Sequence, residues 1–265
     1  MKNNTTQYMN PREREVVARL SYEKVNIITK GQFERYFNFP KSIAEKALFR
    51  LKKKGILDSI KRGVYFFSPL ESGPGGSRIN EFLVPPILFP NGNYYIGYST
   101  MYNYYGFTEQ IFQTIYILNT SVQCEKTIGD TGFKMIKIQN ERLYGLKKIR
   151  IKNTDVMVSD KERTIIDMFY FSESVGGLKK VFEITAAQVG CGNVDIKKLI
   201  KYAAKFPNIS VRKRIGFVLE LAGVEDLSLE PLFMSVMQTS LITLYPSKSR
   251  RGRINKKWKL IENAA

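Results

Sequence analysis

The sequence contains no histidine and only two cysteines in 265 residues. Histidine is the commonest general base and the commonest metal ligand, so most hydrolytic and metal-dependent mechanisms are unexpected here. Cys124 and Cys191 are far apart in the sequence and provide neither a disulfide framework nor a zinc-binding set. No Asp-X-Asp pair of the kind that holds catalytic metals in nucleotidyltransferases is present. We therefore expect no cofactor, no metal and no enzymatic activity.

Long apolar runs are also missing. No stretch approaches the ~20 apolar residues that a membrane-spanning helix needs, and no apolar segment of a secretory signal follows the first residues, Met1 to Thr6. We expect a cytoplasmic protein with no membrane partner.

Acidic residues are scarce, because 42 Lys and Arg stand against 24 Asp and Glu, for a net charge of +18. The excess lies at the two ends: residues 1–80 hold 16 basic and 7 acidic residues, and residues 245–265 hold 7 and 1. Lys and Arg that neutralise phosphates release condensed counterions, so this distribution favours a nucleic-acid partner. A basic protein without any nucleic-acid role is the alternative.

The N-terminal residues predict a DNA-binding fold of the winged helix-turn-helix type. Three helices are expected, at 11–20, 28–37 and 41–54. Asn10 and Thr29 are suitable N-caps for the first two helices, and Gly55 ends the third. Two short runs then predict a β-hairpin, at 56–60 and 63–67. Three helices followed by a hairpin are the winged helix-turn-helix order.

The third predicted helix is the expected recognition helix. Its apolar residues Ala44, Ala47, Leu48 and Leu51 fall on one face, which must pack on the first two helices. The opposite face carries the polar residues that we expect to contact DNA, with base contacts concentrated at the N-terminal end of the helix. These candidates are Lys41, Ser42, Glu45, Lys46, Arg50 and Lys53. A solvated basic surface helix is the alternative.

Other cations extend the predicted DNA contacts. Lys61 and Arg62 occupy the hairpin tip, where they would reach the backbone or the minor groove. Arg212, Lys213 and Arg214 crowd the first turn of a later helix, where the helix dipole disfavours cations, so phosphate or plain solvation is expected there. A C-terminal group either extends the footprint or is a flexible tail, and its members are Arg250, Arg251, Arg253, Lys256 and Lys257. If both the N-terminal and the C-terminal region of the protein contact DNA, the protein would bend the DNA or bridge two repeats.

The expected class is α+β, with a winged helix-turn-helix domain at 1–70, a linker at 71–80 and a larger mixed α/β domain at 81–265 that ends in a basic tail, 245–265. The Gly-rich linker lacks the Gly-Lys-Ser/Thr of a phosphate-binding loop. The larger domain is predicted to become helical toward its C-terminus. Its strands are expected at 94–98, 114–118, 133–138, 146–151 and 256–260, and its helices at 99–105, 160–171, 178–189, 196–206 and 210–222.

Four segments in this order resemble the AbiEi-type antitoxins. They are Tyr98–Gln110, Val158–Asp167 (VSDKERTIID), Val211–Glu220 (VRKRIGFVLE) and Pro246–Leu260. Tyr105 stands where the family usually has histidine, and Phe112 stands where proline is common. The resemblance covers most of the chain, since the segments follow a predicted winged helix.

The resemblance implies a transcriptional repressor that binds inverted repeats in its own promoter. It also implies an antitoxin of a type IV, phage-defence toxin–antitoxin system, whose functional partner is a nucleotidyltransferase-like toxin with which no stable complex is required. An ordinary winged-helix transcription factor with an effector-binding C-terminal domain is the alternative. A neighbouring nucleotidyltransferase-like gene would favour the antitoxin.

The four segments that carry the resemblance also have simple structural interpretations. Ser159 and Glu162 are spaced as a capping box, and Arg163 and Asp167 as an i, i+4 pair on a helix surface. Trp258 is expected to be a core residue. These interpretations need no catalytic role for the acids.

Overall fold

The computed structural model describes residues 9–68, 80–151 and 153–263, which form a mixed α+β protein. The helices are α1 (Pro11–Tyr22), α2 (Lys30–Tyr36), α3 (Lys41–Lys53), α4 (Val84–Leu88), α5 (Ser99–Tyr104), α6 (Lys161–Tyr170), α7 (Leu178–Gly190), α8 (Ile196–Lys205), α9 (Ile209–Leu221) and α10 (Asp226–Met234). The strands are β1 (Ile27–Thr29), β2 (Leu57–Lys61), β3 (Val64–Phe67), β4 (Tyr94–Gly97), β5 (Thr114–Asn119), β6 (Cys124–Ile128), β7 (Thr131–Lys137), β8 (Leu146–Ile151), β9 (Thr154–Ser159), β10 (Ile242–Thr243), β11 (Arg253–Asn255) and β12 (Leu260–Glu262).

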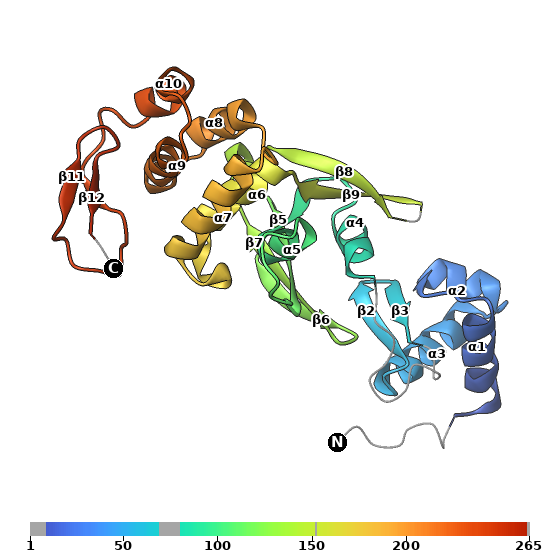
Figure 1. Cartoon of the computed structure of the whole chain (residues 1–265). Coiled ribbons are helices and arrows are strands. Elements are labelled where there is room, and N and C mark those ends of the chain that lie inside the picture. Colours follow the sequence, from blue (N-terminus) through green and yellow to red (C-terminus); the bar gives the residue numbers. More distant parts are fainter. Residues whose placement is uncertain (1–8, 69–79, 152, 264–265) are drawn as a thin grey trace.

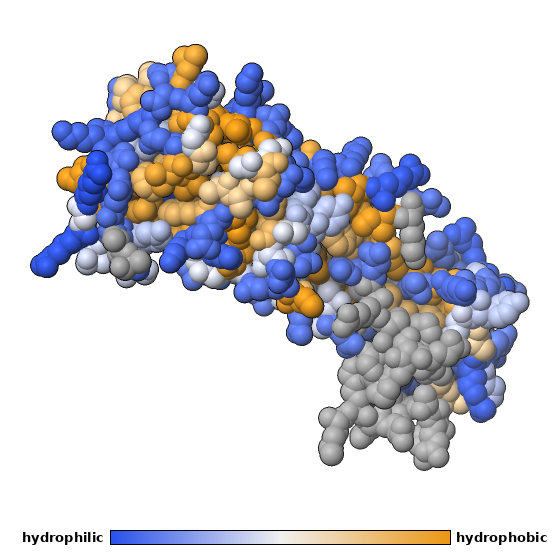
Figure 2. All heavy atoms as spheres, in the orientation of Figure 1, coloured by the Kyte–Doolittle hydropathy of each residue, from blue (hydrophilic) through white to orange (hydrophobic). Residues whose placement is uncertain are grey.

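The molecule is elongated (Figure 1). Helices α1–α3 lie at one end, a six-stranded sheet occupies the middle, and α8–α10 with a small sheet lie at the other end. In Figure 2, apolar residues on the visible face gather mainly over the C-terminal helices, whereas hydrophilic residues cover most of the rest of the coloured surface. Within the described ranges, every helix is too short or too polar to cross a membrane.

The N-terminal region (residues 9–68) has a small core of its own. The buried faces of α1, α2 and α3 meet around Val16, Leu20, Phe33, Leu48 and Leu51. A three-stranded antiparallel sheet in the order β1-β3-β2 completes the region. Such packing on one apolar stripe per helix leaves the opposite stripe of each helix facing solvent.

The central sheet has the order β6-β7-β5-β4-β9-β8, and it is buried on both faces near β4. Tyr95 lies on the face that α6–α9 cover, while Tyr94 and Ile96 lie on the face that packs against α4 and the β2–β3 hairpin. Successive residues of a strand point to opposite faces, so one strand contributes to both cores.

The hairpin of the N-terminal region is docked on this second face. Ile60 and Phe66 are buried in the same core as Val84 and Phe89. Polar contacts reinforce the junction, because the Lys126 ammonium donates to the Ile60 carbonyl at 2.7 Å and the Gly129 amide donates to the Asp58 carboxylate at 3.2 Å. The hairpin and the central sheet therefore share a core, which is separate from the core among α1, α2 and α3. The predicted linker, 71–80, lies outside the described residues except for its last residue.

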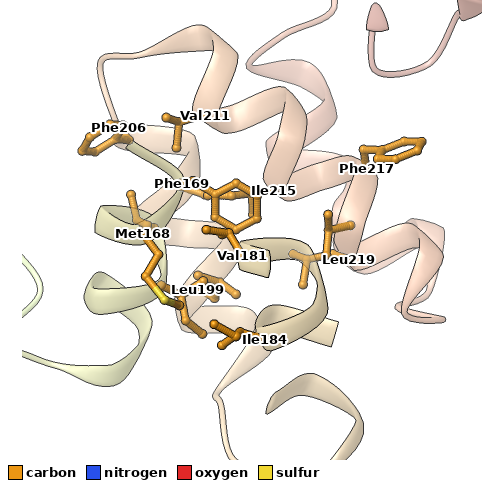
Figure 3. Close-up of a cluster of buried hydrophobic side chains, with 14 of the residues drawn as sticks. Met168, Phe169, Val181, Ile184, Leu199, Phe206, Val211, Ile215, Phe217 and Leu219 are labelled. Carbon is orange, nitrogen blue, oxygen red and sulfur yellow. The ribbon is translucent and has the colours of Figure 1, made fainter. Parts of the chain in front are cut away.

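The C-terminal helices enclose the largest core of the molecule. Figure 3 shows Phe169, Val181, Leu199 and Ile215 converging from α6, α7, α8 and α9. Trp258 is fully buried, as predicted, and its ring lies directly over Gly216 of α9. Residues 242–262 fold beside these helices as a small sheet in the order β10-β12-β11. The C-terminal segment is thus a folded element and not a flexible tail.

Most predicted elements are confirmed, with shifts of a few residues at their ends. The structure adds elements that the sequence did not indicate, namely α4, α10, β1, β6, β9, β10, β11 and β12. The predicted strand at 256–260 is wrong, because 256–259 form the turn between β11 and β12. The start of α6 is also corrected by one residue: Asp160, not Ser159, caps the helix by accepting from the Arg163 amide at 2.8 Å.

Candidate nucleic-acid interface

The turn between α2 and α3 is fixed by its sequence. Asn38 has φ of +50°, a left-handed conformation that asparagine tolerates better than most residues. The rings of Phe33, Phe37 and Phe39 pack together beneath it, with Phe37 and Phe39 stacked at 5.7 Å between centroids. Arg19 of α1 also donates to a backbone carbonyl at the end of α2, at 3.1 Å. These contacts set the angle at which α3 leaves the turn.

Helix α3 has one buried face and one exposed face. Ala44, Leu48 and Leu51 are at most 3% exposed and follow the spacing i, i+4, i+7. A residue two positions away from this stripe is rotated by about 160° around the helix, because each residue turns about 100°. The opposite stripe is therefore Ser42, Lys46, Phe49 and Lys53, and all four residues are exposed.

The cations of the exposed face have no acidic neighbours in ion-pair range. Lys41, Lys46, Arg50 and Lys53 are exposed, and no described carboxylate lies within 4.0 Å of their charged groups. Pro40 occupies the N-cap position of α3, where no described side chain accepts a hydrogen bond from the first turn. The free amides and the helix dipole add positive potential at this end.

Glu45, the one acidic residue of α3, is held by Lys30 of α2. Their charged atoms are 2.5 Å apart. The hydrogen bond from Lys30 lowers the pKa of the Glu45 carboxyl, and the same bond raises the pKa of the Lys30 ammonium. Glu45 is exposed, and its ion pair with Lys30 favours the charged carboxylate.

Of the two cations predicted to contact DNA at the hairpin tip, one is exposed and one is not. Arg62 is exposed at the turn, next to Gly63 with φ of +74°. Lys61 is half-buried, and its ammonium donates to the carbonyl of Ile87 in α4. This contact corrects the assignment of Lys61 to the DNA-contacting set: its side chain points toward the central part of the molecule, because the hairpin is docked there.

The basic run of α9 is placed differently from its prediction. Lys213 is fully buried and Arg214 is 7% exposed. Burial lowers the pKa of the Lys213 ammonium and lowers the pKa of Arg214 to about 10. All three side chains donate to backbone carbonyls: Arg212 to Phe206 and Ser235, Lys213 to Ser240 and Lys259, and Arg214 to Thr243 and Leu244.

These contacts contradict the predicted role of Lys213 and Arg214 in DNA binding. Both cations are buried and donate hydrogen bonds to backbone carbonyls, so they cannot reach a phosphate. Arg212 is half-buried and is engaged in the same way. The three cations hold the C-terminal segment against α9. The unfavourable dipole at this helix start is offset by carbonyl acceptors of the chain itself.

The C-terminal arginines remain exposed but lie far from α3. Arg250, Arg251 and Arg253 are solvent-accessible in β11 and the loop that precedes it. Figure 1 places β11 and α3 at opposite ends of the elongated molecule. A contact of these arginines with DNA would therefore be separate from a contact of α3, and one compact footprint cannot include both.

Arg163 and Asp167 form a buried pair where the sequence predicted a surface pair. Both side chains are fully buried. The Arg163 guanidinium donates to Asp167 at 3.1 Å and to the Tyr95 hydroxyl at 2.8 Å, and that hydroxyl donates to the other Asp167 oxygen at 3.2 Å. Burial raises the pKa of the Asp167 carboxyl. The pair joins α6 to β4, and its distance from solvent fits a structural role.

Phe49 is the residue of the exposed α3 face that was not assigned a contact. Its outward position follows from the helical spacing, but an apolar residue on a basic face carries no charge signal. Among the described residues, no cluster of three Cys, Asp or Glu side chains suits a metal ion.

No protein-family model matches the chain, and no curated protein matches it significantly. Among solved structures, the chain is similar to the RV2827C protein from Mycobacterium tuberculosis, with a TM-score of 0.63 and 13% sequence identity. The match covers 96% of this chain and 92% of that chain. At this identity the likeness establishes a common fold over nearly the whole length.

Proposed function

We propose that this protein binds double-stranded DNA with sequence specificity through a winged helix-turn-helix formed by its N-terminal region, with α3 as the recognition helix. The observation that carries the proposal is the exposed surface of α3, where four exposed cations, two of them on the stripe opposite the buried one, have no ion-pair partners in the described part of the chain. An α-helix of this kind fits the major groove, and unpaired cations favour a polyanion.

The order of elements supports the same proposal. In the N-terminal region, α1, β1, α2, α3, β2 and β3 follow one another as in a winged helix, and β2 and β3 correspond to the wing. Arg62 at the wing tip is available to a phosphate or to the minor groove. The body of the wing is occupied by the docking on the central sheet.

The biological role that we propose is that of an antitoxin and autorepressor of a phage-defence system, on the strength of the sequence resemblance to AbiEi-type antitoxins. In this proposal the N-terminal region binds inverted repeats in the promoter of its own operon. The remainder of the chain counteracts a nucleotidyltransferase-like toxin, and the protein acts in the cytoplasm without catalysing a reaction.

DNA binding is tested with the full-length protein and the duplex upstream of its own gene, against a shuffled duplex of equal composition. We expect Lys41→Ala/Lys46→Ala to lose most of the preference for the upstream duplex. The matched control is Lys197→Ala/Lys201→Ala, two exposed lysines of α8 at the other end of the molecule. Equal binding of the wild type to both duplexes, or an unchanged preference in the α3 variant, would overturn the proposal.

The antitoxin role is tested by co-expression with the nucleotidyltransferase-like protein that the adjacent gene would encode. We expect the wild type to restore growth of cells that express this toxin. The α3 double variant should also restore growth but lose repression of a promoter fusion, because the two activities reside in different regions. A wild type that represses the promoter but fails to restore growth would favour an ordinary transcription factor.

A further inference from the structure

Phe49 is the large apolar side chain of α3 that faces solvent. It is 67% exposed, and it stands between Lys46 and Lys53 on the stripe opposite the buried face. A rotation of about 160° from Leu51 directs it away from the N-terminal core. Packing among the described residues therefore does not explain a phenylalanine at this position.

The surroundings of Phe49 restrict what can cover it. Burial of a phenylalanine side chain raises a binding constant by about tenfold to a hundredfold, so a partner that covers the ring gains from it. The exposed neighbours along this face are Lys46, Arg50 and Lys53, and the one carboxylate of the helix is held by Lys30. The partner must be negatively charged around an apolar group. Duplex DNA offers this combination, because thymine places a 5-methyl group in the major groove between two rows of phosphates.

We propose that Phe49 is a specificity-determining residue that contacts the 5-methyl group of a thymine in the bound DNA. The inference rests on the proposed function, since it assigns a base to one residue of the recognition helix. Ser42 and Lys46 lie on the same stripe toward the N-terminal end of α3, so the thymine lies next to the bases that these polar residues contact.

The test starts with selection of preferred duplexes from a random pool by the full-length protein. Each thymine of the selected site is then replaced in turn by deoxyuridine, which lacks only the methyl group. We expect one position, or two related by symmetry, where the wild type loses about fourfold in affinity per methyl group. Phe49→Ala should bind the thymine form about tenfold more weakly, because it loses the covered ring as well as the methyl contact, and it should no longer distinguish thymine from deoxyuridine there. Phe49→Leu should retain part of the discrimination.

Leu227→Ala in α10 is the matched control, because Leu227 is 86% exposed and lies at the other end of the molecule. It should keep the full discrimination. The inference is overturned if the wild type selects a site but binds thymine and deoxyuridine equally at every position, or if Phe49→Ala still discriminates. A wild type that selects no sequence would instead overturn the proposed function, so the two failures are distinguishable.

Discussion

Helices α3 and α9 each contain thirteen residues and each carries a run of cations, yet the structure uses those cations in opposite ways. In α3 the cations face solvent. In α9, Lys213 and Arg214 are buried and donate to backbone carbonyls of the C-terminal segment. The same residue types therefore form a candidate ligand surface in one helix and an internal support in the other.

The apolar pattern distinguishes the two helices better than their charge does. In α3 the buried residues form one stripe, so everything outside that stripe is accessible. In α9 every residue from Val211 to Leu219 except Arg212 is buried, and a helix that is apolar around most of its circumference is covered on all sides. Its cations are enclosed with it and need acceptors.

The largest expected effect tests the structural role of α9. Gly216→Ala should destabilise the protein by about 3 kcal/mol, because the added Cβ would lie 2.1 Å from the Trp258 ring. Urea unfolding measures the change. Gly190→Ala near the end of α7 is the control, since its added Cβ meets no atom within 4 Å, and it should change stability by less than about 1 kcal/mol. Equal effects of the two substitutions would show that Trp258 does not depend on Gly216.

A smaller loss of stability is expected when the buried cation Arg214, close to Gly216 in α9, is replaced. Arg214→Met keeps much of the side-chain volume but leaves the carbonyls of Thr243 and Leu244 without this donor, which should destabilise the protein by about 2 kcal/mol. DNA affinity per folded molecule should not change. Arg251→Met, at an exposed site, is the control for stability. A selective loss of DNA affinity in Arg214→Met without destabilisation would restore the sequence prediction for α9.

The sequence predicted α1, α2 and α3 well because local signals agreed there. The caps at Asn10 and Thr29, the stop at Gly55 and the apolar stripe all lie within a few residues of the elements that they define. The exposed face of α3 follows from the same stripe. The general α+β class was predictable for the same reason.

Whether the other cations are exposed or buried depends on contacts with residues that are distant in the sequence. Arg214 meets carbonyls 29 and 30 residues away, and Lys61 meets a carbonyl 26 residues away. Arg163 and Asp167 are buried because Tyr95, 68 residues earlier than Arg163, lies over them. No local sequence pattern identifies these partners. The sequence therefore predicted, from charge alone, that these side chains would be exposed.

A third prediction sharpens the role of the second half of α3. Arg50→Ala/Lys53→Ala should weaken binding to all duplexes by about tenfold and reduce the slope of log affinity against log salt by about 2, because phosphate contacts are independent of sequence. The unfolding free energy should change by less than about 0.5 kcal/mol per substitution, since both residues are exposed. Lys197→Ala/Lys201→Ala again serves as the control. An unchanged salt slope would place these two cations outside the DNA footprint.

The smallest expected effect concerns the ion pair between Lys30 and Glu45. This pair lies on the exposed face of α3, a kind of face that the buried helix α9 lacks. The Lys30 hydrogen bond lowers the pKa of Glu45 in the folded state, so the stabilisation is present above the pKa of the unfolded chain and disappears as the pH falls through the folded pKa. Glu45→Gln should therefore lower the melting temperature slightly at pH 7, and the difference should close on acidification. Glu15→Gln, an exposed residue of α1, is the control. A difference that is constant with pH would indicate that Glu45 contributes through its shape and not through its charge.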